Sequence, residues 1–283
     1  MKKIGIVGAG TMGSGIACAA ALAGFDVSLN DVSEEILKRA KDRISEDLRK
    51  GVERGKLTTA QAASAEAKVN ISTHLQDLSP CSVVIEAALE SLEIKEEIFS
   101  RLDALCPSDS ILATNTSSLS VTAIASSTKQ RDRVVGMHFF NPARLMNLVE
   151  IVRTEYSSES TIQRTVDLAK QMGKRAVVVK DTPGFIVNRV ARPFYGEALR
   201  ILGEGVASVQ EIDRIVRLEG GFKMGPFELM DLIGIDVNFT VTQSMYEQTF
   251  GEPRYRPHVI QKNMVHAGYL GRKTQRGFYR YDR

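Results

Sequence analysis

The hydrophobic residues of the first two thirds of the chain form short apolar runs, separated by longer stretches in which apolar positions recur at helical spacing. Short runs predict buried strands, and periodic stretches predict helices lying against them. From 92 to 105, for example, apolar residues stand at 94, 98, 102 and 105, along one helix face. The expected strands are 2–7, 25–30, 69–73, 82–87, 110–115, 133–139, 148–152 and 175–180. This alternation predicts an α/β fold, a doubly wound parallel sheet with helices on its faces.

The pattern changes at the sequence Asp181-Thr182-Pro183-Gly184, after which the chain reads as mostly helical. Ser208-Val209-Gln210-Glu211 forms a capping box, and Pro226 suits the first turn of a helix. Because Pro and Gly separate structural segments, we place a boundary there. The expected organisation is a Rossmann-type domain over 1–182 and an all-helical domain over 183–283.

The first apolar run, "KIGIVGAGTMGSGIA" from residue 3 to residue 17, allows two interpretations. Two lysines before an apolar stretch with small residues are compatible with an export signal. Five glycines interrupt the stretch, however, and an export signal or a membrane span needs a continuous apolar block. A strand followed by a Gly-rich turn and a helix accounts for every glycine, so we expect neither export nor a membrane anchor.

The turn Gly8-Ala9-Gly10-Thr11-Met12-Gly13 has the G-x-G-x-x-G spacing of a dinucleotide-binding site. The first glycine permits the tight turn, the second lets the backbone approach a pyrophosphate, and the third lets the helix pack against the strand. Asp31 lies at the end of the next expected strand, where a carboxylate can bind an adenosine ribose and repel the 2'-phosphate of NADP. The sequence therefore predicts NAD as the cofactor.

The composition mainly excludes certain kinds of partner and site. The chain has 283 residues and a net charge of +3, too small an excess to indicate nucleic acid or a membrane surface as a partner. Its three cysteines, Cys18, Cys81 and Cys106, are widely spaced and form neither a disulfide framework nor a metal-binding pair. We expect buried thiols, no metal site and a cytoplasmic protein.

The segment from 38 to 56 reads as a helix and carries eight Lys or Arg against four acids. A solvent-exposed face with salt bridges is one explanation. A binding site for a polyphosphate substrate is the other, because clustered cations attract phosphates. The residues alone leave both open.

Among the four histidines, His138 is the best candidate for a proton-transferring group. It ends an expected strand, and ligands of open α/β sheets bind beyond the carboxyl ends of the strands. A nicotinamide enzyme that oxidises an alcohol needs such a base. Glu150, in the apolar run "LVEIV", could orient the imidazole if the two strands lie close together, or could be a surface carboxylate on an edge strand.

Three polar residues could accompany His138. Ser117 and Ser118, in "NTSSLS", follow the strand ending at Asn115, and their hydroxyls could bind a substrate oxygen or cap the next helix. Asn188, in "TPGFIVNRV", could contact the same oxygen, although by itself it would be assigned to a contact between domains.

Eight motifs resemble the 3-hydroxyacyl-CoA dehydrogenase family in their order and span nearly the whole chain. They are "GAGTMGSGIA", "EAALESLEIKEEIF", "NTSSLS", "HFFNP", "LVEIV", "DTPGFIVNR", "MGPFEL" and "GRKTQRGFY". Within this family, the chain most resembles the short bacterial members that act on 3-hydroxybutyryl-CoA. This resemblance favours phosphate binding as the role of the basic helix.

The resemblance implies a role for each matching position. The catalytic pair would be His138 and Glu150, with Ser117 and Asn188 near the substrate oxygen. Cofactor contacts would come from Gly8, Gly10, Thr11, Met12, Gly13, Asp31, Glu90, Lys95, Asn115, Asn141 and Lys273. Coenzyme A would contact the basic helix through Lys50, Arg54 or Lys56.

The implied activity is reversible NAD-dependent oxidation of (S)-3-hydroxybutyryl-CoA to acetoacetyl-CoA by a homodimer joined through the helical domain. Arg144, Leu145, Asn147 and Gln275 depart from the usual motifs, which leaves the acyl chain length open. Two alternatives are a dehydrogenase of hydroxy acids that lack coenzyme A, and a dinucleotide sensor without turnover.

Overall fold

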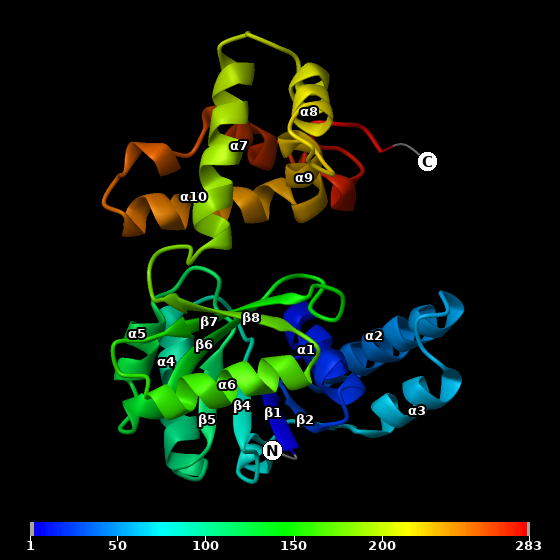
Figure 1. Cartoon of the computed structure of the whole chain (residues 1–283), viewed down its shortest axis with the longest axis vertical. Coiled ribbons are helices and arrows are strands. Elements are labelled where there is room, and N and C mark those ends of the chain that lie inside the picture. Colours follow the sequence, from blue (N-terminus) through cyan, green and yellow to red (C-terminus); the bar gives the residue numbers. More distant parts are fainter. Residues whose placement is uncertain (1–2, 282–283) are drawn as a thin grey trace. The chain divides into compact units, whose positions relative to one another are not determined.

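The computed structural model describes residues 3–281, so Lys2, which begins the first expected strand, lies outside the described residues. The chain divides into two compact units, the first ending at Thr182 and the second beginning at Pro183. Both units are drawn in Figure 1.

The first unit is built on an eight-stranded sheet of order β3-β2-β1-β4-β5-β6-β7-β8. Strands β1 to β6 are parallel, as expected, but β7 pairs with β6 in the antiparallel sense and β8 is parallel to β7. The last two strands are therefore reversed, a feature the apolar pattern did not reveal. The strands are β1 (Lys3–Val7), β2 (Asp26–Asn30), β3 (Val69–Ser72), β4 (Val83–Glu86), β5 (Ile111–Thr114), β6 (Val134–Phe139), β7 (Leu148–Arg153) and β8 (Arg175–Lys180).

Helices cover both faces of this sheet and bury two separate apolar clusters (Figure 1). One cluster joins the sheet to α1, α2 and α6, and the other joins it to α4 and α5. Alternate strand residues point to opposite faces, so Val83 belongs to the first cluster and Val84 to the second. The helices are α1 (Thr11–Leu22), α2 (Glu34–Glu53), α3 (Thr59–Ala67), α4 (Leu92–Leu105), α5 (Val121–Ser126) and α6 (Glu159–Gln171).

Helix α2 ends earlier than predicted from the basic segment 38–56. It stops at Glu53, and Arg54 is its C-cap. Gly55 then adopts a φ of 65°, a conformation that glycine tolerates and that ends the helix. As a result Arg54 and Lys56 lie in a turn rather than on the expected helix.

The second unit is helical, and its core is formed by residues of α7, α8, α9 and α10. The expected capping box begins α8, where Ser208 and Glu211 bind each other's backbone N–H groups, and Pro226 is the first residue of α9. The helices are α7 (Val187–Gly203), α8 (Val209–Leu218), α9 (Pro226–Ile233), α10 (Ile235–Gln248) and α11 (Val259–His266). In the described part of the chain, no helix has the length and apolar character needed to cross a membrane.

Candidate active site

The glycine turn has the geometry that its spacing predicts. Gly8 adopts a φ of 93°, and a Cβ there would lie 2.6 Å from the carbonyl oxygen of Ala87. A Cβ on Gly13 would lie 1.7 Å from the carbonyl oxygen of Gly8, so only glycine lets α1 approach this closely. At Gly10 a Cβ would meet nothing within 4 Å, which leaves the backbone open to a ligand.

The N-terminus of α1 follows this open backbone directly. Its N-cap is Gly10, which has no side chain to bind the first N–H groups, and Thr11 and Met12 form the first turn. These N–H groups and the helix dipole favour a phosphate. Asp31 accepts hydrogen bonds from the N–H of Ala9 (2.8 Å) and of Ser33 (3.1 Å), so its carboxylate lies beside the turn. The arrangement fits a dinucleotide, with the pyrophosphate at α1 and the ribose at Asp31.

His138 and Glu150 face each other across the antiparallel pair β6–β7. His138 Nδ1 lies 2.8 Å from Glu150 Oε2, and the two residues are 3% and 1% exposed. The carboxylate is therefore buried against the imidazole and is not an edge-strand surface group. Because their backbones are direct partners in the register, the pairing is fixed by the sheet itself.

The tautomer of His138 follows from this contact. A carboxylate only accepts hydrogen bonds, so Nδ1 carries a proton, and in the neutral form of the ring Nε2 is the nitrogen without one. Ser117 Oγ lies 3.0 Å from Nε2 and donates to it. Ser117, His138 and Glu150 thus form one chain of hydrogen bonds, in which Nε2 of His138, next to the Ser117 hydroxyl, is the nitrogen able to accept a proton.

Glu90 holds the loop that carries Ser117. Its Oε1 accepts hydrogen bonds from Thr116 Oγ1 (2.6 Å), from the N–H groups of Ser117 (2.9 Å) and Ser118 (3.1 Å), and from Ser118 Oγ. Partial burial raises the pKa of Glu90, but Lys95 and these donors outweigh burial and hold the pKa below its usual value. Glu90 is therefore a carboxylate that fixes the active-site loop, and Ser118 belongs to this fixation.

Lys95 is more deeply buried than expected for a side chain that contacts the cofactor directly. It is 1% exposed, its Nζ lies 2.6 Å from Glu86 Oε1 and 3.5 Å from Glu90 Oε2, and Glu86 is itself fully buried. Glu86 also accepts from Thr114 Oγ1 (2.6 Å) and from the N–H of Ala88 (2.7 Å). Sequence reasoning missed Glu86, although a lone carboxylate ending the apolar run "SVVIE" is the same signal that identified Glu150.

Two asparagines lie at the ends of the neighbouring strands. Asn115 follows β5 and accepts a hydrogen bond from the N–H of Phe139 (2.9 Å), which ties the loop after β5 to the end of β6. Asn141 is exposed in the turn after β6 and precedes a cis peptide bond to Pro142. Asn115 thus links the strands beside His138, and Asn141 remains accessible.

The basic residues at the end of α2 are not equivalent. Lys50 pairs with Glu46 at 2.7 Å, within the helix. Within residues 3–281, Arg54 and Lys56 have no acidic partner in ion-pair contact. These two cations are therefore the ones available to a phosphate.

The remaining site residues belong to the second unit. Asn188 lies in the first turn of α7, and Lys273 lies in a short 3-10 helix with its Nζ 2.6 Å from Asp236 Oδ2.

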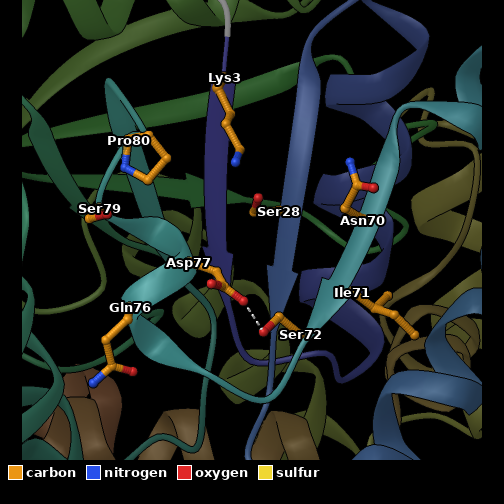
Figure 2. Close-up of a pocket in the computed structure, with 9 residues that line it drawn as sticks. All are labelled: Lys3, Ser28, Asn70, Ile71, Ser72, Gln76, Asp77, Ser79 and Pro80. Carbon is orange, nitrogen blue, oxygen red and sulfur yellow. Dashed lines mark hydrogen bonds between the residues drawn. The ribbon is translucent and has the colours of Figure 1, made fainter.

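A polar cavity of about 360 Å³ lies elsewhere on the first unit. Figure 2 shows Lys3 and Ser28 on β1 and β2, Asn70 on β3, and a hydrogen bond between Ser72 and Asp77. None of the expected catalytic or cofactor-binding residues lines it, and β4 and β5 separate β1 from β6. The cavity is not part of the candidate active site.

The three cysteines are free and buried, as expected. Burial raises the pKa of Cys18 to about 12 and that of Cys81 to about 11, and it also raises the pKa of Cys106. These thiols are therefore not nucleophiles. Among residues 3–281, no cluster of His, Cys, Asp or Glu could hold a metal ion.

Comparison with known proteins gives matches over both units. The family model described as "3-hydroxyacyl-CoA dehydrogenase, NAD binding domain" matches residues 3–182, and "3-hydroxyacyl-CoA dehydrogenase, C-terminal domain" matches residues 184–281.

Full-length relatives agree with these matches. A 3-hydroxybutyryl-CoA dehydrogenase of Clostridioides difficile is 42% identical over 281 residues, which are 99% of this chain and 100% of the relative. A 3-hydroxyadipyl-CoA dehydrogenase of Escherichia coli K12 is 45% identical over 279 residues, 99% of this chain but only 59% of that longer relative. The crystal structure of an (S)-3-hydroxybutyryl-CoA dehydrogenase from Ralstonia eutropha matches with a TM-score of 0.95 at 42% identity, over 100% of both chains.

Proposed function

The chain belongs to the 3-hydroxyacyl-CoA dehydrogenase family, and its first domain is the NAD-binding domain of that family. We propose that it catalyses the reversible oxidation of the 3-hydroxyl group of a short (S)-3-hydroxyacyl-CoA, such as 3-hydroxybutyryl-CoA, with His138 as the proton-transferring residue. The observation that carries this proposal is the Ser117–His138–Glu150 chain of hydrogen bonds, with a buried imidazole and carboxylate, beside the end of the parallel strands.

His138 acts as the base in the oxidative direction. Its bare Nε2 accepts the proton of the 3-hydroxyl, and Glu150 stabilises the imidazolium that results. Bound NAD supplies the hydride acceptor. Ser117 Oγ, which donates to Nε2 in this structure, is placed to donate to the substrate oxygen instead. In the reductive direction the imidazolium returns its proton to the 3-keto oxygen.

Glu90 and Lys95 support this reaction through position. Glu90 accepts a hydrogen bond from the backbone of Ser117, and Lys95 forms ion pairs with both Glu90 and Glu86. We therefore propose that Lys95 contributes to the cofactor site by orienting Glu90, since its own ammonium group is buried. Gly10, the first turn of α1, Asp31, Asn115, Asn141 and Lys273 remain the proposed direct contacts.

Coenzyme A is proposed to bind through its phosphates to Arg54 and Lys56, which have no acidic ion-pair partner within residues 3–281. The second domain is proposed to supply Asn188 at the substrate oxygen and the contact that forms a homodimer. Exposed apolar side chains on this unit, such as Leu218 and Phe222, support the dimer because large exposed apolar residues mark interaction surfaces. The expected cytoplasmic location stays a prediction.

The decisive experiment is reduction of acetoacetyl-CoA by NADH, compared with free acetoacetate and with NADPH. We expect turnover that needs the coenzyme A group and prefers NADH, because Asp31 would repel the 2'-phosphate of NADPH. His138→Gln should lower kcat by about 10²- to 10⁴-fold with little change in KM. His74→Gln, in an exposed histidine outside the site, is the matched control and should keep the wild-type rate.

Two results would overturn the proposal. Undiminished turnover in His138→Gln would remove the imidazole from the mechanism. Equal rates with acetoacetyl-CoA and free acetoacetate would favour a dehydrogenase of simple hydroxy acids, and NADH binding without any turnover would favour a sensor.

A further inference from the structure

Arg144 and Lys174 bring two positive charges into one cavity of the first unit. The cavity has a volume of about 270 Å³ and lies between the second half of α1 and the end of α6. Besides the two cations, its walls include Ala19, Leu22, Met172 and Gly173. No catalytic or cofactor-binding candidate among residues 3–281 lines it, and neither does a residue of α2 or of the turn that carries Arg54 and Lys56. The proposed function therefore leaves this cavity unassigned.

Lys174 is bound to the loop that joins β6 to β7. It is 7% exposed, and its Nζ donates to the carbonyl oxygens of Ala143 (2.7 Å), Met146 (2.8 Å) and Arg144 (3.2 Å). These acceptors are neutral, and no carboxylate of the described chain is in ion-pair contact with the ammonium group. Burial lowers the pKa of Lys174, and the charge of Arg144 lowers it further. The loop is thus held by a cation whose charge is not compensated.

The guanidinium of Arg144, a residue that departs from the usual family motifs, lacks an acceptor in the same cavity. Its Nε is buried without a hydrogen-bond partner, and in the part of the chain that the structure describes no Asp or Glu is in ion-pair contact with it. Burial raises the pKa of Cys18 and Asp47 raises it further, so this carboxylate of α2 lies nearby, but it pairs with neither cation. A buried donor without an acceptor is unfavourable, and a ligand that supplies the acceptor is favoured.

The ends of α1 and α6 compensate the two cations only in part. Ala23 is the C-cap of α1 and Met172 is the C-cap of α6, and both residues line the cavity. The negative end of a helix dipole amounts to about half an elementary charge and attracts cations. These ends explain how two cations can share the empty cavity, but they leave Arg144 Nε without an acceptor. The cavity is therefore able to take up an anion.

We propose that this cavity binds a phosphate dianion, as inorganic phosphate or as a small phosphate monoester, at Arg144 and Lys174. The planar fork of arginine presents two parallel N–H groups to phosphate oxygens. Lys174, whose N–H groups are already donated to carbonyl oxygens, contributes its charge. A dianion matches the two cations, whereas a carboxylate would leave one of them uncompensated. The cavity is smaller than the sites of drug-sized ligands, which favours a small anion.

The bound phosphate also stabilises the loop between the two catalytic strands. This loop follows the strand of His138, carries Asn141 and leads into the strand of Glu150. Within it, the N–H groups of Leu145 and Met146 both donate to the carbonyl oxygen of Pro142 (2.9 and 3.0 Å). An anion between Arg144 and Lys174 removes the repulsion of two charges that are both attached to this loop. Opening of the loop then requires release of the anion.

The test is a calorimetric titration of the full chain with inorganic phosphate, at constant ionic strength and at a pH where phosphate is a dianion. Saturating NAD and coenzyme A are present, because the first turn of α1 and the cations Arg54 and Lys56 are themselves expected to bind phosphate. We expect one site with a Kd of about 1 mM. Arg144→Met should weaken binding by at least about 10-fold, and Arg144→Lys should have an intermediate effect because lysine keeps the charge but loses the fork.

Arg175→Met is the matched control. It removes one positive charge directly beside Lys174 in the sequence, but Arg175 is exposed and does not line the cavity, so the Kd should change by less than about 2-fold. Three results would overturn the proposal: no phosphate binding, the same Kd in Arg144→Met as in the wild type, or an equal weakening in Arg175→Met. Phosphate binding that depends on Arg144 but disappears when coenzyme A is added would also overturn it, because the cavity would then belong to the coenzyme A site.

Amide hydrogen exchange tests the effect on the loop. At a phosphate concentration of about ten times Kd, the exchange of Leu145 and Met146 should slow by about 10-fold in the wild type and remain unchanged in Arg144→Met. Equal exchange with and without phosphate would show that the anion does not stabilise the loop. Neither measurement depends on turnover, so a failure of the proposed function in the acetoacetyl-CoA assay and a failure of this inference are separate results.

Discussion

Arg133 in the first unit and Arg192 in the second are equally buried, each 4% exposed, yet their surroundings differ. Arg133 pairs with Asp103 at 2.9 Å and donates to the carbonyl oxygens of Asp103, Cys106 and Pro107. Arg192 has two neutral acceptors and a tyrosine ring. In both residues Nε lacks an acceptor, so the difference lies in the compensation of charge.

This contrast shows that burial alone does not identify the purpose of a charged side chain. The charge of Arg133 is compensated by Asp103, and the contacts of Arg133 link α4 to the start of β6. Within residues 3–281, Arg192 contacts only neutral acceptors and the ring of Tyr195, so no carboxylate compensates its charge. Four measurements of stability test whether the difference is real.

The largest effect is expected for Arg133→Met. The substitution leaves Asp103, whose side chain is 7% exposed, without its cation, and removal of one partner of a buried pair costs about 3–5 kcal/mol of unfolding free energy. Urea unfolding followed by circular dichroism measures it. Arg101→Met, which removes an exposed cation of α4 that faces Glu97, is the control and should change stability by less than about 0.5 kcal/mol. An equally small effect at Arg133 would show that the pair contributes little.

The second effect is the coupling between Arg133 and Asp103. In the double variant Arg133→Met/Asp103→Asn no carboxylate is left unpaired, so its destabilisation should be about 2 kcal/mol smaller than the sum of the single variants. A double-mutant cycle from the same unfolding curves gives this number. Simple additivity would mean that the two charges do not stabilise each other.

Arg192→Met should have a smaller effect, a loss of about 1 kcal/mol or less. Thr242 Oγ1 still donates to the carbonyl oxygen of Asn238 (2.8 Å), so the substitution leaves no buried acceptor without a donor. The unfolding measurement is again the readout, in the absence of substrate. A loss as large as that of Arg133→Met would indicate that the folded chain already compensates the charge of Arg192, against our comparison.

The smallest effect is a pH dependence. Burial raises the pKa of Asp103, but the bonds from Arg133 and from the N–H of Lys129 outweigh it and hold the pKa below its usual value. A carboxyl with a lowered folded-state pKa stabilises the fold above its unfolded pKa of about 3.9, and this stabilisation is lost as the pH falls through the folded-state pKa. The stability difference between wild type and Asp103→Asn should therefore shrink below about pH 4, whereas a constant difference would contradict the assigned shift.

Much of the fold could be predicted from the sequence because its signals are local. The glycine turn, the strands and the capping box of α8 depend on residues close together in the chain, whose φ angles and apolar spacing permit few conformations. The catalytic candidates His138 and Glu150 were found in the same way, as polar residues at the ends of or within apolar strands. The order of the motifs along the chain then supported the family resemblance, which implied a role for each matching residue.

The partners of the charged groups could not be predicted in this way. Lys95 was expected at the cofactor and is buried against Glu86, and Glu90 holds the loop of Ser117 through residues more than 25 positions away. The antiparallel pairing of β6 with β7 sets the register that joins His138 to Glu150. Arg192 carried no signal at all in the sequence.

The sequence by itself therefore determined the elements, the dinucleotide turn and the imidazole with its candidate acid, since these follow from steric limits and periodicity within short segments. Only the tertiary structure decided which charges are compensated, because the solvent exposure and the partner of a charged side chain depend on residues that folding brings together from distant parts of the chain. Arg133 and Arg192 are the same residue type in the sequence, and only their partners in the folded chain distinguish them.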